Sequence, residues 1–251
     1  MDGIGREFMD KTRYAHLGLS AQQHGMPQPP LQAELAAGCS IDLPDPGKVS
    51  VGTFDLRRAI EGRRSLRSYA DRAFSLDELS FLLWCTQGIR DRVPGKATFR
   101  TVPSAGARHP FETAVFVRRV DGLDAGLYQY LSMDQRLVSF DTPGDLDERM
   151  TAACLGQEIA ATCALLFVWV ADSQRMTWRY GERGYRYLHL DAGHVCQNLY
   201  LAAEAIEAGA CAIGAFDDDA VNDLLGIDGV DRFAVYLAAV GKRPPAKSPG
   251  A

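Results

Sequence analysis

The stretch Arg63-Arg64-Ser65-Leu66-Arg67-Ser68-Tyr69 places three arginines and two serine hydroxyls within seven residues. Arginines this dense beside a turn can bind a phosphate or another planar anion. The same pattern also suits a solvated basic face at the end of a helix. The stretch therefore predicts an anion site that the rest of the chain has to support.

Helix signals lie on both sides of the basic stretch. A helix is predicted over residues 55–62, and Ser75 with Glu78 forms a capping box that opens a second helix reaching Gln87. Residues 90–110 are rich in proline and glycine and predict a long functional loop. Further helices are predicted over 145–163, 187–208 (ended by Gly209) and 217–225, and strands over 111–119, 126–130, 136–140, 164–170, 210–216 and 233–240.

This order of elements predicts an α+β or mixed α/β sandwich. A Rossmann domain is disfavoured, because no GxGxxG motif follows a strand. Residues 1–50 carry two proline-rich clusters and predict an N-terminal arm that packs on the body or on a partner subunit. Residues 51–245 form the predicted main domain, and residues 246–251 a flexible tail.

Composition excludes several classes of function. The net charge of -5 argues against nucleic-acid binding, and no apolar run approaches the roughly 20 residues of a membrane span. The N-terminus shows no signal peptide, and the six cysteines form no CxxC pair, so we expect a cytoplasmic protein with reduced thiols. His189 and His194 fall on different faces of a helix, and no metal site is predicted.

Four short motifs, in order, resemble those of flavin nitroreductase-like proteins. Residues 63–69 resemble the RRSxRxF/Y signature, Pro103-Ser104-Ala105-Gly106 the PS(A/S)G loop, and residues 211–216 the C-x-I-G-x-F strand end. Gly241-Lys242-Arg243 resembles the basic C-terminal phosphate contact. The segment 180–187, read as YGERGYRY, is most similar to the SagB-type branch, the dehydrogenases of thiazole and oxazole biosynthesis.

The resemblance implies a nitroreductase-like mixed β-sheet flanked by helices, with a long central helix, in an interlocked homodimer. Two FMN molecules would lie at the subunit interface. Arg63, Arg64 and Ser65 would hold the phosphate and ribityl end of FMN. Lys242 and Arg243 would add positive charge at the phosphate.

The remaining cofactor contacts implied by the resemblance surround the ring of FMN. Arg67 would approach the pyrimidine ring, and the backbone at Ile213, Gly214 and Ala215 would face flavin N5. Gln157 is a weaker candidate that also suits a helix surface. The isoalloxazine would be lined, from the partner subunit, by Pro103, Ser104, Ala105 and Gly106.

The resemblance also identifies where the reaction would occur. Oxidation of an azoline to an azole needs a base beside the flavin, and the SagB branch carries a Lys-Tyr pair before the GERxYRY segment. Here the pair is Arg179-Tyr180. Arginine cannot act as a base, so Tyr180 is the candidate catalytic base and Arg179 would stabilise its phenolate. Alternatively, Tyr180 only packs and Arg179 pairs with Glu182.

Two further polar pairs stand near these motifs. Arg108-His109 replaces an apolar-aromatic pair of the relatives, so His109 could shape substrate choice or act as an acid or base, although a loop histidine is more often solvated. Asp191 and His194 lie three residues apart on the long helix and are interpreted mainly as a structural pair.

Three functions remain open on this evidence. The first is an FMN-dependent dehydrogenase or oxidase of a peptide- or carrier-bound azoline in natural-product biosynthesis. The second is an NAD(P)H-dependent reductase of nitro or quinone compounds. The third is a non-catalytic, flavin-binding subunit of a synthetase complex. A synthetase partner is therefore possible beside the homodimer.

Overall fold

Two fully buried, mainly apolar strands form the centre of the fold, β4 (Phe111–Val117) and β7 (Leu165–Asp172). The computed structural model describes residues 3–49 and 54–245. A seven-stranded sheet has the order β1-β6-β5-β4-β7-β9-β8, and its pairings are antiparallel throughout, where the resemblance implies a mixed sheet. The other strands are β1 (Ser40–Asp42), β5 (Gly126–Leu131), β6 (Arg136–Ser139), β8 (Ala208–Ile213) and β9 (Arg232–Lys242).

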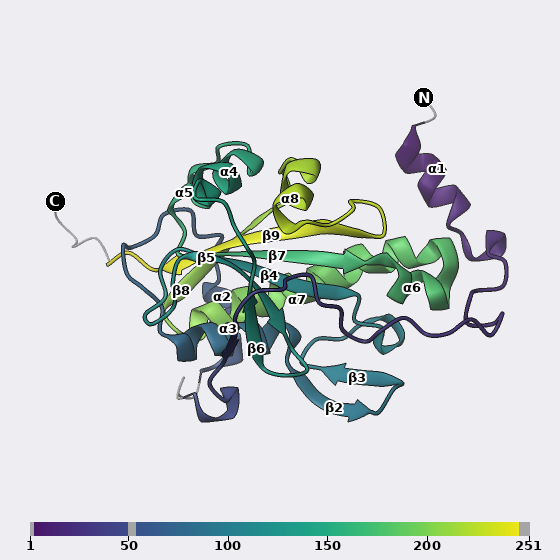
Figure 1. Ribbon diagram of the computed structural model, residues 1–251, viewed down its shortest axis with the longest axis horizontal. Helices are drawn as coiled ribbons and strands as arrows, with labels where there is room; N and C mark the ends of the chain where they lie inside the picture. Colours follow the sequence, from purple (N-terminus) through teal and green to yellow (C-terminus); the bar gives the residue numbers. More distant parts are fainter. Residues whose placement is uncertain (1–2, 50–53, 246–251) are drawn as a thin grey trace.

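Helices cover both faces of this sheet (Figure 1). Side chains of β7 alternate between two cores, because successive residues of a strand point to opposite faces: Phe167 and Trp169 lie in one, Leu166 and Val168 in the other. The first core also holds residues of α3 (Leu76–Gln87) and α7 (Gly184–Ala205), and α2 (Leu56–Gly62) contacts α7. The second is covered by α4 (Leu146–Ala153), α5 (Glu158–Thr162) and α8 (Asp218–Leu225). The predicted α+β fold with a long central helix is confirmed.

The capping box predicted for α3 is present. Ser75 Oγ accepts a hydrogen bond from Glu78 N, and Glu78 Oε2 accepts one from Ser75 N at 2.9 Å. These bonds satisfy two backbone donors that an open helix end would leave exposed.

Among the described helices, none combines the length and the apolar character needed to cross a bilayer.

Three local predictions were wrong. The long loop contains a hairpin of β2 (Ile89–Val93) and β3 (Ala97–Arg100), which the turn at Gly95 (φ 66°) permits. The single helix 145–163 is divided into α4 and α5, because Leu155 and Gly156 have positive φ and interrupt the helix. The long helix ends at Ala205 and Glu207 adopts a left-handed φ of 54°, whereas Gly209 lies in β8.

The N-terminal arm begins with α1 (Ile4–Lys11) and returns to the sheet at β1. Gln129 on β5 is fully buried and holds the arm from inside the sheet. Its amide accepts a hydrogen bond from Leu35 N and donates one to Ala33 O, both at 2.7 Å. The arm therefore packs at this point on its own chain. The predicted tail 246–251 lies outside the described residues.

Candidate functional site

The basic stretch runs across the ends of β8 and β9. Leu66 N donates to Ala210 O at 2.9 Å, and Ala70 N donates to Lys242 O at 2.9 Å. Two strand glycines make room for this approach. A Cβ on Gly209 would lie 2.6 Å from the Leu66 side chain, too close for any ordinary packing. A Cβ on Gly241 would lie 2.4 Å from the Tyr69 ring.

The hydroxyl of Tyr200 joins the basic stretch to the end of β8. It lies 3.1 Å from Ser65 Oγ and accepts a hydrogen bond from Ala212 N at 2.8 Å. The guanidinium of Arg63 lies 5.2 Å from the centre of the Tyr200 ring. No motif in the sequence indicates Tyr200, whose one signal is a polar-tipped aromatic on the buried face of the long helix.

The three arginines of the stretch keep their positive charge available. Arg64 Nη1 donates to two backbone carbonyls, those of Glu61 and Arg63, and Arg67 Nη1 donates weakly to Ser65 O. Within residues 3–49 and 54–245, no carboxylate pairs with any of these three arginines. Arg64 and Arg67 are exposed. Their charges can therefore be neutralised by an anion from outside the chain.

The strand end after Ile213 lies beside this basic stretch. Gly214 and Ala215 are exposed, and Gln157 Nε2 donates to Ala215 O at 2.7 Å and to Cys154 O at 2.9 Å. Gln157 is therefore not on the surface of a continuous helix. It occupies the break before α5, where its side chain fixes the backbone at Ala215.

Lys242 and Arg243 have different surroundings. The Lys242 side chain is 3% exposed, forms an ion pair with Glu78, and donates to Ile206 O at 3.1 Å. Arg243 is partly exposed, pairs with Glu204, and lines a surface cavity together with Gly62 at the end of α2. Arg243 thus lies near the basic stretch, whereas the ammonium of Lys242 already has an internal carboxylate partner.

A second cluster forms around the loop Pro103–Gly106. Asp191 on α7 is buried, which raises its pKa, and its Oδ1 accepts a hydrogen bond from Ala105 N at 3.4 Å. The distance from Asp191 Oδ1 to His194 Nδ1 is 3.9 Å, and the His194 side chain is half exposed. This contact is a loose pair at the helix surface.

Gly106 brings the loop against Arg179 and Tyr180. Its φ is 58°, and a Cβ there would lie 2.4 Å from Tyr180 Oη and 3.0 Å from Arg179 Nε. Tyr180 packs edge-on against Tyr187, and the Arg179 guanidinium lies 5.8 Å from the Tyr180 ring centre. Among the described residues, Arg179 has no ion pair, so the alternative pairing with Glu182 is not present.

His109 lies next to this loop and is not a solvated loop residue. It is 5% exposed with a left-handed φ of 44°, and its backbone N donates to Ser104 Oγ at 2.8 Å. Burial, followed by the charges of Arg100 and Arg108, lowers the pKa of His109 to about 3. The imidazole is therefore neutral at physiological pH.

The two clusters are separate within one chain. Asp191 contacts the Pro103–Gly106 loop, and Tyr200 contacts the basic stretch, nine residues further along α7. At about 1.5 Å of rise per residue, the two contacts are roughly 13 Å apart along the helix. The fold thus brings together Arg63 to Arg67, Gln157 and Ile213 to Ala215 in one place, and Pro103 to Gly106 with Arg179 and Tyr180 in another.

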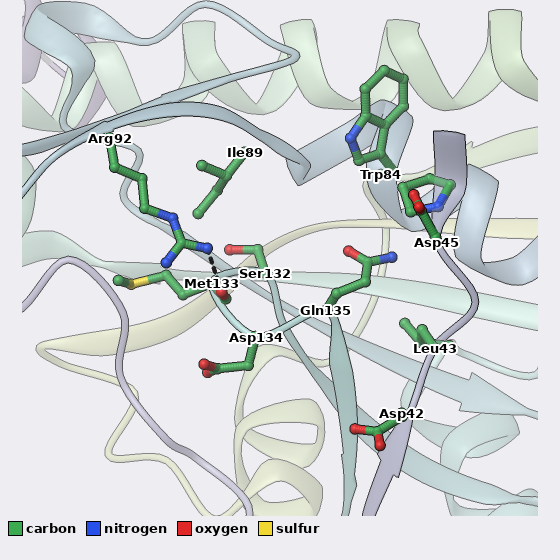
Figure 2. A pocket seen from close by; sticks show the side chains of 11 residues that line it. Asp42, Leu43, Asp45, Trp84, Ile89, Arg92, Ser132, Met133, Asp134 and Gln135 are labelled. Carbon is green, nitrogen blue, oxygen red and sulfur yellow. Dashed lines mark hydrogen bonds between the residues drawn. The ribbon is translucent and has the colours of Figure 1, made fainter. Parts of the chain in front are cut away.

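A further cavity of about 500 Å³ is lined by a different set of residues (Figure 2). Asp42, Asp45 and Asp134 give it an acidic lining, opposed by Arg92, which donates to Met133 O. None of the predicted site residues lines this cavity.

The fold and these clusters define an α+β protein with an exposed arginine-rich stretch, and comparison with known proteins gives its family. Residues 60–242 match the nitroreductase family. MJ1384 of Methanocaldococcus jannaschii, named among the nitroreductases, is 34% identical over 203 residues, which cover 81% of this chain and 96% of the relative. The chain belongs to the nitroreductase family, whose members are oxidoreductases that generally use a flavin.

Other relatives extend the comparison. The trifolitoxin-processing protein TfxB of Rhizobium leguminosarum bv. trifolii is 28% identical over 162 residues, covering 61% of this chain and 43% of TfxB. A solved structure from Anabaena variabilis, also named among the nitroreductases, has a TM-score of 0.68 at 32% identity and covers 82% of this chain and 42% of that one. This chain thus spans less than half of both proteins.

The Escherichia coli microcin synthetase McbBCD complex, solved with truncated pro-MccB17, contains a chain of the same fold. Its TM-score is 0.59 at 20% identity, with 81% of this chain and 78% of that chain covered. The resemblance read from the motifs is confirmed for the nitroreductase family, and the TfxB match supports its SagB-type branch.

Proposed function

We propose that this protein is an FMN-dependent dehydrogenase of an azoline, converting it to an azole in natural-product biosynthesis. The observation that carries the proposal is the contact of Arg179 and Tyr180 with the Gly106 loop, at the position of the SagB-type Lys-Tyr pair. The relationship to TfxB, a trifolitoxin-processing protein, supports a role in natural-product biosynthesis.

The residues of the basic stretch fit the phosphate of FMN. Arg63, Arg64 and Arg67 have no carboxylate partner among the described residues, and a phosphate would supply one. Arg243 lies close enough to line the neighbouring cavity with Gly62. Direct contact between Lys242 and the phosphate stays a prediction, and it would require the ammonium to leave Glu78.

The separation of the two clusters supports a homodimer. FMN held at Arg63 to Ser65 of one subunit would meet Tyr180 and the Pro103–Gly106 loop of the partner subunit, as the resemblance implies. In this arrangement residues 51–245 form the flavin-binding domain, and residues 1–50 form an arm along it. We place the protein in the cytoplasm, where thiols stay reduced.

The residues around the flavin would then have distinct tasks. When bound, FMN would supply a two-electron acceptor, and molecular oxygen would take those electrons and form hydrogen peroxide. Tyr180 Oη would accept the proton of the ring carbon that becomes part of the new double bond. Arg179 would stabilise the phenolate form of Tyr180, which becomes a neutral phenol when it takes this proton, and exposed Gly214 would let the flavin approach the backbone.

The test is to reconstitute the protein with FMN and mix it anaerobically with an azoline peptide or with NADPH. Loss of visible flavin absorbance with the azoline alone would support the dehydrogenase. The family relationship also supports a second candidate, the NAD(P)H-dependent nitro or quinone reductase, which predicts rapid reduction by NADPH. A flavin that neither compound reduces would indicate a non-catalytic subunit of a synthetase.

A further inference from the structure

A cavity of about 440 Å³ lies between the N-terminal arm and the segment that carries Arg179 and Tyr180. The arm contributes Tyr14, Leu17 and Leu19, and the body contributes Arg179, Tyr180 and Arg183. This volume falls within the range of about 300–1,000 Å³ that is usual for small-molecule sites. The cavity therefore adjoins the proposed catalytic base and has one wall made by a segment that precedes the family-matched region.

Hydrogen bonds hold this arm wall in place. Trp178 on α6 (Ser173–Tyr180) accepts from Gln22 N at 2.8 Å through its carbonyl and donates from its indole to Met26 O at 2.9 Å. Arg183 Nη1 donates to Thr12 O at 2.9 Å. These bonds join the body to the arm at Thr12, and again at Gln22 and Met26. The fold itself therefore fixes the shape of the cavity.

The charges that line the cavity are all positive. Among the described residues in its wall, none is acidic, and Arg179 and Arg183 are both present. Arg179 has no hydrogen-bond or carboxylate partner among the described residues, so its planar fork of donors is free to bind. Arg183 uses Nε for Tyr187 and Nη1 for Thr12, which leaves Nη2 without a described partner.

A buried arginine behind the wall adds to this positive potential. Arg108 is 3% exposed, its guanidinium lies 4.8 Å from the centre of a Trp178 ring, and its Nη2 has no hydrogen-bond partner among the described residues. Burial lowers the pKa of Arg108, and the next contribution is the positive charge of Arg179. Arg175, by contrast, is neutralised by Glu112 and Asp172. An anion in the cavity would therefore compensate a cluster that lacks an internal counter-charge.

We infer that this cavity binds a carboxylate of the substrate through Arg179, with Arg183 as a second donor. A carboxylate matches the planar arginine fork in a bidentate contact. The inference rests on the proposed function, which supplies the azoline ring of the substrate. It narrows the substrate to an azoline that bears a free carboxylate. A carboxylate at Arg179 would also keep the adjacent ring carbon beside Tyr180, the proposed base.

The test is equilibrium binding, which does not depend on turnover. The FMN-loaded full chain is titrated calorimetrically with a methylthiazole carboxylic acid, which has no ring hydrogens left to lose by this oxidation, and with its uncharged carboxamide. We expect the acid to bind about tenfold more tightly than the amide, and Arg179→Gln to abolish this preference. Arg92→Gln, in the separate acidic cavity, should retain it.

Equal affinity for acid and amide in the unaltered chain would overturn the inference, as would a preference that survives Arg179→Gln. Inorganic phosphate that displaces the acid at or below the acid's own dissociation constant would also overturn it, by identifying a phosphate site. An acid preference without azoline oxidation would leave this inference standing and reject the proposed reaction. Oxidation of azoline amides as fast as azoline acids would support the proposed reaction and reject the carboxylate site.

Discussion

Glu78 and Lys242 form an ion pair that joins the first turn of α3 to the end of β9. The carboxylate has two tasks, because its other oxygen completes the capping box with Ser75. Lys242 is nearly fully buried, also lies over the ring of Phe74, and donates to Ile206 O. The last strand of the sheet is thus fastened electrostatically to the helix that precedes the hairpin.

Removing this carboxylate should destabilise the fold. Glu78→Gln leaves a buried ammonium without its counter-charge, and because Glu78 is 26% exposed and Lys242 keeps its bond to Ile206, we expect a loss of about 2–3 kcal/mol of unfolding free energy. Urea unfolding measures this loss. Asp77→Asn, an exposed acid in the same helical turn, is the control, and equal effects of the two substitutions would contradict the buried pair.

Arg64 should contribute to cofactor affinity. Arg64→Ala removes a donor to the proposed phosphate, and a hydrogen bond to a charged partner is worth about 1.5–3 kcal/mol, so FMN affinity should fall by at least tenfold. Fluorescence quenching of FMN on binding measures it. Arg57→Ala removes an exposed arginine of α2 that pairs with Glu61 and should leave affinity unchanged. An unchanged affinity in Arg64→Ala would refute its role.

Tyr180→Phe should slow azoline oxidation at least a hundredfold while leaving FMN affinity within a factor of two, because only the proton acceptor is lost. Stopped-flow reduction of the flavin by the azoline measures the step directly. Tyr128→Phe is the matched control, since the Tyr128 hydroxyl donates to Asp124 O, a backbone carbonyl outside both clusters. Turnover that survives Tyr180→Phe would reject Tyr180 as the base.

Gly106→Ala should displace Tyr180. The added Cβ would lie 2.4 Å from Tyr180 Oη, and the alanine would also have to keep the left-handed φ of 58°. Gly95→Ala separates these effects, because Gly95 has a φ of 66° and nothing within 4 Å of its Cβ position. Both variants should lose about 1 kcal/mol of stability from the backbone strain. Only Gly106→Ala should also lose azoline turnover, and equal turnover in both variants would exclude the proposed contact.

Acid should destabilise the protein through His109. Its pKa is about 3 when folded and about 6.5 in an unfolded chain. Between these values the unfolded state binds more protons, so this contribution is complete above pH 6.5 and is lost as the pH falls. At pH 5 the loss is about 2 kcal/mol relative to pH 7.5. His109→Asn tolerates the positive φ and should show a smaller decline in urea unfolding; an identical decline would contradict the assignment.

Regular elements were predictable where local signals are strong. The capping box of α3 and the apolar run of β7 depend on neighbouring residues, and both were found as predicted. The break at Leu155 was missed, although Gly156 follows it, because a non-glycine residue adopts the first positive φ there. The hairpin β2–β3 was missed because its alternation is weak and most of its residues are exposed.

For the candidate site, motifs gave residue types but not their partners. The exposure of Arg64 and Arg67 follows from a dense arginine turn, whereas the burial of Lys242 depends on Glu78, 164 residues away in the sequence. Tyr200 and the arm wall of the cavity are likewise long-range contacts. Spacing within a segment cannot specify such contacts, because they arise only when distant segments pack together.

The distance between the two clusters along α7 has a consequence for mixed populations of chains. A chain altered at Arg64 keeps its own Tyr180 cluster, and a chain altered at Tyr180 keeps its own basic stretch. If each flavin lies between two subunits, a heterodimer of these two impaired variants contains one undamaged site. Co-expression should therefore restore up to half of the normal activity per dimer, a form of genetic complementation that a site confined to one chain could not show.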